Sequence, residues 1–212
     1  MRMKNILFFL FFIGTIHSSY SQSVGLFVGM NNAKLSGDTP NEARYKSLLG
    51  LNVGALVDIP LTESTTLSIQ PSYSQGGTRV EYQVPGVLEP VDSIKIRTNY
   101  FSLPVLLKIS ATNKRFYAIG GIEYSMLLNS ALSSHGKEED VDLGLSSWNL
   151  SVHFGAGYRV PIGITNLFFE IKYIQGLVNL TDKPLEKSYI PRVKSSGIII
   201  NGGIEIPLNN LF

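Results

Sequence analysis

The sequence contains no cysteine, so a disulfide-bonded scaffold, a thiolate metal site and a lipid-modified N-terminal cysteine are all excluded. No segment beyond the N-terminal region has 18 consecutive apolar residues, which excludes a transmembrane helix there. Charged residues are scarce, at 16% against roughly 25% in soluble domains. Hydrophobic residues make up 44%, and glycine occurs 20 times among 212 residues. This composition is unusual for a soluble exported protein.

The first 21 residues have the pattern of a secretory signal peptide. Arg2 and Lys4 precede a short apolar run, and small residues stand just before an expected cleavage site ahead of Gln22. These two bases are the whole positive excess of the chain, so the remaining 191 residues carry sixteen basic and sixteen acidic side chains. A neutral chain has no general attraction for nucleic acid. We predict a signal peptide over 1–21 and a single domain over 22–212.

Period-two alternation of apolar and polar residues runs through this domain and predicts β-strands. Most of the expected strands have ten or more residues, which is longer than in typical soluble sheets and suits a tilted membrane-crossing strand of about 9–11 residues. We predict eight strands, over 23–31, 47–59, 65–75, 94–109, 115–128, 147–160, 165–178 and 195–208.

The connections between these strands alternate between short and long. Tight turns are expected at 60–64, 110–114 and 161–164, and long polar loops at 32–46, 76–93, 129–146 and 179–194. An even number of strands with short turns at one end and long loops at the other is typical of a bacterial outer-membrane barrel. The prediction is an all-β, eight-stranded antiparallel up-and-down transmembrane barrel with both termini on the periplasmic side.

Such a barrel must close on itself. The bilayer core offers no water to an unpaired backbone group, and each such group at an open sheet edge costs several kcal/mol. We therefore expect the first strand to pair with the eighth.

Alternation alone does not determine which face of the sheet points inward. In the strand at 147–160, the face with Trp148 and Phe154 is apolar, and the face with Ser151 and His153 is polar. A soluble lipocalin-like barrel would turn the apolar face inward, whereas a membrane barrel turns it outward. The polar face is poor in charge and rich in small residues, as a narrow lumen requires, which favours the membrane barrel. Aromatic residues near the strand ends also suit headgroup girdles: Tyr73, Phe101, Phe116, Trp148, Tyr158, Phe169 and Phe212.

With the polar face inward, six charged side chains are expected to share the lumen: Lys108, Glu123, Arg159, Glu170, Lys172 and Glu205. Polar neighbours are expected beside them: Asn52, Asp58, Gln70, His153 and Asn201. An isolated buried charge is very costly, so we expect these groups to pair, with Glu170 or Glu123 against Arg159 or Lys172. The favoured interpretation is a salt-bridged plug that holds the barrel shut, and the alternative is a narrow polar pore or proton path.

Signals for metal binding or catalysis are weak. The segment 134–142 holds four acids but lacks the ordered oxygen spacing of a calcium loop, so a solvated loop is favoured over a divalent-cation site between lipopolysaccharide headgroups. His135 and His153 are the histidines of the expected mature chain, and His153 shares the polar face with Ser151. A lone strand histidine is usually a hydrogen-bonded filler. We predict no catalytic, cofactor-binding or metal-binding residues and no cofactor.

The segment 99–108, NYFSLPVLLK, resembles the proline-containing strand of the PorT-like outer-membrane β-barrel family of the Bacteroidetes. The segments 116–121, 154–158 and 168–177 are similar to three further strands of the family. The resemblance implies an eight-stranded barrel in the outer membrane. The namesake of the family takes part in a protein secretion and gliding apparatus, but most members resemble it only in fold, and fold does not carry function.

The sequence thus predicts a small outer-membrane barrel without catalytic activity, with a structural role or a docking role performed by its long loops. The expected partners are outer-membrane lipid and a surface or periplasmic protein, and a link to a secretion or surface apparatus is implied by the resemblance. Three alternatives remain at this point: a lipid-modifying barrel enzyme, a soluble lipocalin-like binder and a narrow solute channel.

Overall fold

The computed structural model describes residues 22–37, 43–82, 92–134, 137–140, 145–180 and 193–208. The predicted signal peptide over 1–21, His135 and Phe212 lie outside these described residues. Among the described residues, no helix has the length and apolar character needed to cross a membrane.

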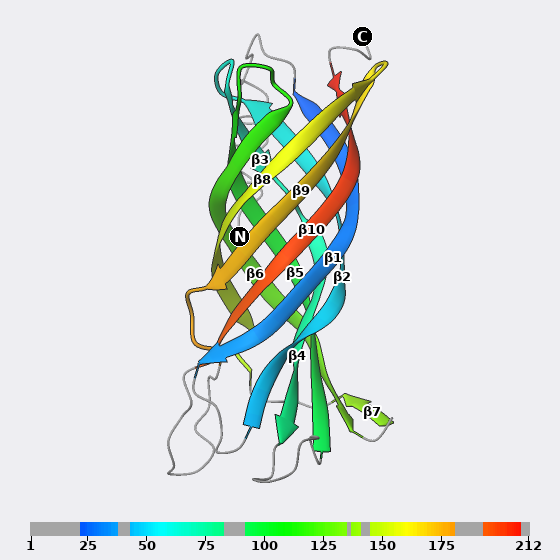
Figure 1. Ribbon diagram of the computed structural model, residues 1–212, viewed down its shortest axis with the longest axis vertical. Coiled ribbons are helices and arrows are strands. Elements are labelled where there is room, and N and C mark those ends of the chain that lie inside the picture. The colour runs from blue at the N-terminus through cyan, green and yellow to red at the C-terminus, as the bar shows by residue number, and fades with distance from the viewer. Residues whose placement is uncertain are drawn as a thin grey trace, which may run out of the picture.

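Ten antiparallel strands form one closed sheet (Figure 1). The strands are β1 (Ser23–Gly37), β2 (Ala43–Pro60), β3 (Thr65–Ile69), β4 (Ser72–Tyr82), β5 (Asp92–Ser110), β6 (Phe116–Ser134), β7 (Lys137–Asp140), β8 (Trp148–Ile162), β9 (Thr165–Gly176) and β10 (Val193–Pro207). Since β3 and β4 share one place between β2 and β5, and β7 pairs with β6 as a short addition, the ring has eight positions. The eight-stranded barrel is therefore confirmed.

The first and last strands close the ring. β1 pairs with β10 along its whole length, from Ser23 opposite Pro207 to Gly37 opposite Val193. This pairing gives the backbone of both strands hydrogen-bond partners on both sides, as the bilayer interior demands. The predicted pairing of the first and last strands is confirmed.

The single strand predicted over 65–75 is wrong, because the chain is interrupted between β3 and β4. Pro71 has no N–H to donate to a neighbouring strand, so the regular ladder stops there. Backbone bonds on either side keep the ring closed: Ala55 N donates to the Pro71 carbonyl at 3.0 Å, and Gln70 N donates to the Pro104 carbonyl at 3.0 Å. The break therefore interrupts the strand without opening the barrel.

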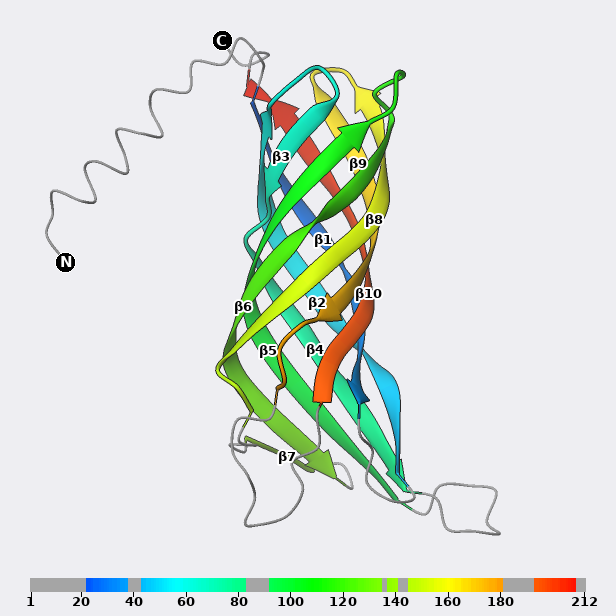
Figure 2. The same ribbon diagram turned by 90° about the vertical axis from the view of Figure 1, so that its left-hand side faces the viewer.

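The three short turns lie at one end of the barrel, together with both ends of the described chain (Figure 2). Leu208 N donates to the Gln22 carbonyl at 2.7 Å, which joins the two ends there. In an outer-membrane barrel, the short-turn end faces the periplasm. The termini of the domain are therefore periplasmic.

At the opposite end, part of the barrel wall extends further than predicted. β2, β4, β5 and β6 continue past the level where β9 stops (Figure 2). The expected loops over 32–46, 76–93 and 129–146 are therefore wrong in part, since they contain the ends of β1, β2, β4, β5 and β6 and all of β7. The apolar–polar alternation ends where the wall leaves the bilayer, but the backbone ladder continues beyond that level.

The apolar face points outward, which confirms the membrane orientation and overturns the lipocalin-like alternative. Leu26 on β1 is 63% exposed and Phe154 on β8 is 61% exposed, while Glu170 on β9 is 2% exposed. On β5, every second residue from Phe101 to Ile109 is an exposed apolar side chain. Eight steps of about 3.4 Å at a tilt of about 40° give an apolar band about 20 Å tall, close to the roughly 25 Å of known barrels.

Aromatic side chains gather at both edges of this band. At the short-turn edge, the Phe116 and Tyr158 rings lie 4.6 Å apart. At the other edge, the Tyr124 and Trp148 rings lie 6.3 Å apart and nearly parallel. Aromatic rings at these two levels are typical of the headgroup girdles of membrane barrels.

Candidate functional site

The lumen is the part of the molecule where polar chemistry is concentrated, and it divides into two zones. Toward the short turns lies a zone of ion pairs, here called the charge network, formed by Asp58, Lys108, Arg159, Glu170, Lys172 and Glu205 with Gln70 and Tyr117. Toward the long-loop end lies a cavity with many hydroxyl groups. Glu123 and His153 lie between the two zones.

Lys108 on β5 is the centre of the charge network. Its Nζ lies 3.0 Å from Asp58 Oδ2 on β2 and 3.0 Å from Glu170 Oε1 on β9, so one cation joins three strands across the lumen. Tyr117 on β6 donates a hydrogen bond to the same Glu170 oxygen at 3.1 Å. The Lys108 cation also lies 5.4 Å from the centre of the Tyr117 ring, within the range of cation–π attraction.

A second cation uses the other oxygen of Glu170. Lys172 Nζ on β9 lies 3.0 Å from Glu170 Oε2 and donates to Gln70 Oε1 at 2.6 Å. Gln70, in the break between β3 and β4, donates in turn to Ser68 Oγ at 3.1 Å. Glu170 therefore accepts from both lysines, and the break in the wall positions an amide oxygen that is a second acceptor for Lys172.

Arg159 on β8 forms the end of the network nearest the short turns. Its Nε lies 2.6 Å from Glu205 Oε1 and its Nη2 lies 3.2 Å from Glu205 Oε2, a two-point contact with β10. Nη2 also lies 3.7 Å from Asp58 Oδ2, which links this pair to Lys108. Asn166 Nδ2 donates to Glu205 Oε1 at 3.1 Å. A two-point guanidinium–carboxylate contact adds directional specificity to the charge attraction.

Two glycines make room for aromatic rings inside the charged zone. A Cβ at Gly157 would meet the Tyr117 ring, and a Cβ at Gly203 would meet the Phe168 ring. Phe168 packs with Phe27 and Leu56 as a small buried cluster beside the ion pairs. Since an eight-stranded barrel is only wide enough for side chains to fill it, the space between the charges is occupied by these rings.

Glu123 on β6 and His153 on β8 form a separate pair on the long-loop side of the network. His153 Nε2 lies 3.1 Å from Glu123 Oε2, and the His153 side chain is fully buried. The other carboxylate oxygen accepts hydrogen bonds from Ser125 Oγ at 2.7 Å and Ser102 Oγ at 3.4 Å. The serines therefore contact the acid and not the imidazole.

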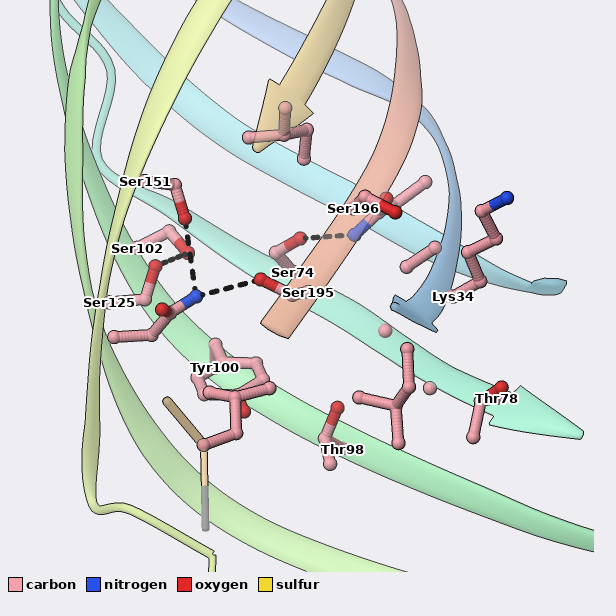
Figure 3. Close-up of a pocket in the computed structure, with 18 of the residues that line it drawn as sticks. Lys34, Ser74, Thr78, Thr98, Tyr100, Ser102, Ser125, Ser151, Ser195 and Ser196 are labelled. Atoms are coloured by element: carbon pink, nitrogen blue, oxygen red, sulfur yellow. Dashed lines mark hydrogen bonds between the residues drawn. The ribbon is translucent and has the colours of Figure 1, made fainter. Parts of the chain in front are cut away.

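The cavity at the long-loop end is lined by hydroxyl groups from several strands (Figure 3) and by apolar side chains that include Ala33, Ile96 and Leu180. Its volume is about 70 Å³. Hydroxyl side chains that point into it are Ser74, Thr78, Thr98, Tyr100, Ser102, Ser125, Ser151, Ser195 and Ser196. Two amides fix the lining: Asn31 Nδ2 donates to Ser74 Oγ at 3.2 Å, and Asn149 Nδ2 donates to Ser151 Oγ at 3.2 Å and Ser195 Oγ at 3.0 Å. Neutral hydrogen bonds thus connect the strands at this level.

The structure brings the six predicted lumen charges into the barrel interior. Five of them belong to the charge network, whereas Glu123 stands apart with His153. Of the predicted polar neighbours, Asp58 and Gln70 are members of the network, and Asn52 Nδ2 donates to Asn201 Oδ1 at 2.9 Å beside it.

Sequence reasoning missed the inward aromatics and the hydroxyl-lined cavity. Tyr117 has the same strand parity as Glu123, so counting along β6 would have placed it inside. The cavity had no comparable signal. Its serines, such as Ser74, Ser102 and Ser125, lie in predicted strands, but alternation does not show that the strands leave a space at this level. The predicted acidic loop 134–142 has no described side chains, and among the side chains that are described no group of three or more acids, histidines or cysteines could hold a metal ion.

Comparisons with known proteins agree with this architecture. Among solved structures, the chain is similar to surface protein A of Neisseria, at 12% identity over 87% of this chain and 96% of that chain, with a TM-score of 0.51. OprG of Pseudomonas aeruginosa gives 13% identity over 88% and 95%, with a TM-score of 0.45. Ail of Yersinia pestis gives 16% identity over 88% and 99%, with a TM-score of 0.42. No curated protein matches the chain in sequence.

The similarity to the neisserial protein shows a shared fold and nothing about activity. The family model described as "Outer membrane protein beta-barrel domain" matches residues 20–182, which is most of the chain. A closed ring with a lipid-facing apolar band and a polar lumen is the structure that this description names. The chain therefore belongs to the family of outer-membrane protein β-barrel domains and resides in the bacterial outer membrane.

Proposed function

We propose that this protein is a non-catalytic barrel, closed to solutes, that presents its long-loop end to a surface partner. The observation that carries the proposal is the charge network. Lys108 joins β2, β5 and β9, and Arg159 joins β8, β10 and β2, so ion pairs cross the lumen in several directions at one level. A solute that passed this level would have to separate them.

Separation of these pairs would be costly. Lys108, Glu170 and Lys172 are each at most 2% exposed, and removal of one partner from a buried pair typically costs about 3–5 kcal/mol. The network therefore supports a plug in preference to a solute pore or proton path. The hydroxyl-lined cavity lies on the long-loop side of this plug.

The arrangement around His153 supports a role without catalysis. A serine nucleophile needs a base within hydrogen-bond reach, but Ser102 and Ser125 contact Glu123 on the side away from His153. His153 is also buried in the lumen, so it cannot face a lipid substrate at the outer surface of the barrel. We assign no catalytic residue to this chain.

The docking part of the proposal rests on the extension of the wall beyond the bilayer. β2, β4, β5 and β6 form a rigid base from which the connecting segments emerge, and loops held by a rigid scaffold commonly carry binding. Membership of the PorT-like family in particular, with its link to a secretion or gliding apparatus, remains a prediction. Capture of a surface protein by the wild-type barrel, lost when 83–91 or 181–192 is replaced by a glycine–serine linker, would support the docking role.

Conductance across a planar bilayer tests closure. We expect the folded wild-type barrel to give no stepwise conductance at neutral pH, because the ion pairs obstruct the lumen. A general porin inserted in the same bilayer is the positive control, and a shift in gel mobility on boiling shows that the barrel was folded. Stepwise conductance by the wild-type protein would contradict the proposal and support the solute-channel alternative.

A further inference from the structure

Four basic residues lie close together on the outer face of the extended wall. Lys46 on β2 is directly opposite Arg79 on β4, and Arg79 is directly opposite Lys95 on β5. Arg97 lies two residues from Lys95 on the same strand, opposite Gly77. These four residues are here called the basic row.

The basic row points away from the lumen. Thr78, Val80 and Thr98 on the same strands are buried toward the interior, and successive side chains of a strand point to opposite faces. Lys46 and Lys95 are exposed, and the Lys46 side chain is 59% exposed. The row therefore faces whatever surrounds the barrel at this level.

The row carries more positive charge than its described neighbours neutralise. Like charges directly opposite each other on neighbouring strands are destabilising. Lys46 Nζ lies 2.7 Å from Glu81 Oε2, and no other ion pair to this row is found among the described side chains. Arg79 Nε is buried and has no hydrogen-bond partner among them. Arg79 Nε on the outer face of β4 is therefore not satisfied by any described group of the protein.

The position of the row along the barrel indicates what surrounds it. Tyr73 and Phe101 are directly opposite each other at the edge of the apolar band that lies toward the long loops. Arg97 lies four residues beyond Phe101, which at about 3.4 Å per residue and a tilt of about 40° is about 10 Å further out. This level is past the hydrocarbon core, where lipid headgroups replace acyl chains. Other exposed bases lie near the long-loop ends of β1, β2 and β10: Lys34, Arg44 and Lys194.

We propose that the basic row binds phosphate groups on the headgroups of outer-leaflet lipids. Guanidinium groups recognise phosphate through paired N–H donors, and a lysine adds a compact positive charge. The lipid assignment follows from the lateral position of the row next to the aromatic edge of the band, where lipid is the constant neighbour of the barrel. A soluble polyanion would have no reason to select a site at the membrane surface on the side of the wall.

Acidic residues of the chain itself are the main rival for this role. β7 places Glu138 opposite Ser133, and Ser133 is opposite Lys95, so the backbone register continues the row toward an acidic strand. Asp140 occupies the equivalent position beyond Arg97, opposite Ala131. If these acids neutralise the row, phosphate lipid should bind only after they are removed.

The test compares two matched double variants of the full folded chain. R79Q/K95Q removes one arginine and one lysine from the row, and K114Q/R115Q removes one of each from the exposed short turn at the opposite end. Binding of a bisphosphorylated lipid A and of its dephosphorylated form, in neutral mixed micelles, is measured by native mass spectrometry and calorimetry. Heat-modifiability confirms that each variant is folded.

We expect the wild-type protein and K114Q/R115Q to bind the phosphorylated lipid with affinities within twofold of each other. R79Q/K95Q should bind it at least tenfold more weakly, because each base near a membrane surface strengthens binding a few-fold. The preference for phosphorylated over dephosphorylated lipid should fall by the same factor. Equal binding by the two double variants, or no phosphate preference in the wild type, would overturn the proposal. It would also be overturned by phosphate binding that appears only in E138Q/D140N, or by equally tight binding of soluble polyphosphate without a lipid chain.

Discussion

Toward the short turns, the lumen is crossed by lysine, arginine and carboxylate side chains, whereas toward the long loops it is lined by serine, threonine and asparagine. Both zones connect strands that are distant in sequence, but they respond differently to the loss of one group. A buried charge without its partner is far more costly than a neutral donor without its acceptor. The comparison indicates that the charged zone contributes more to the integrity of the barrel, whereas the hydroxyl zone surrounds a cavity of about 70 Å³.

Among the variants that test this comparison, removal of the carboxylate shared by two lysines is expected to lower the free energy of unfolding the most. Glu170→Gln leaves Lys108 and Lys172 without their common partner, and both lysines are almost fully buried. We expect the free energy of unfolding, measured by urea titration from lipid vesicles, to fall by about 3–5 kcal/mol. Glu63→Gln, in an exposed turn, is the control and should change it by less than about 0.5 kcal/mol. A loss below about 1 kcal/mol for Glu170→Gln would mean that the charged zone does not stabilise the barrel more than the hydroxyl zone does.

Packing within the charged zone should respond to a single added methyl group. The Cβ of Gly157→Ala would meet the Tyr117 ring and displace the side chain that donates to Glu170. We expect a loss of about 1–3 kcal/mol in the same unfolding experiment. Gly120→Ala is the matched control on the neighbouring strand, because nothing lies within 4 Å of its added Cβ. Equal stability of the two variants would show that the Tyr117 ring has room to move.

The smallest effect is expected in the hydroxyl zone. Ser195→Ala removes an acceptor from Asn149 Nδ2, which keeps a second acceptor in Ser151. We expect a loss of about 0.5–1.5 kcal/mol, the usual contribution of one neutral hydrogen bond. A loss as large as that of Glu170→Gln would remove the contrast between the two zones.

Much of the barrel follows from sequence periodicity. The bilayer on one side and a narrow lumen on the other impose strict alternation within the apolar band, so the eight strands and their inward faces could be predicted. The ends of the strands could not, because this constraint stops at the membrane surface while the backbone ladder continues to Gly37, Tyr82 and Ser134. For the same reason Lys46 and Arg79 of the basic row fell in predicted loops, whereas Lys95 and Arg97 fell in the predicted strand 94–109, and the register of the row across β2, β4 and β5 had no sequence signal.

The candidate site was predictable as a set of residues but not as a set of contacts. Strand parity places Lys108, Glu170 and Lys172 inside, since each lies on the polar face of its strand. The partner of each charge depends on the stagger between strands that are far apart in the ring, which sequence alternation does not encode. The position of Asp58 between Lys108 and Arg159, and the contact of Gln70 with Lys172 at the strand break, were therefore visible only in three dimensions.

The central claim is that charges in the periplasmic half of the lumen stabilise the barrel because they are paired. A double-mutant cycle on Lys108 and Glu170, with Lys108→Met, Glu170→Gln and the double variant unfolded from vesicles, tests it most directly. We predict that the double variant loses at least about 1 kcal/mol less than the sum of the single losses, because removing both groups leaves fewer unpaired buried charges. Losses that add within about 0.5 kcal/mol would contradict the account.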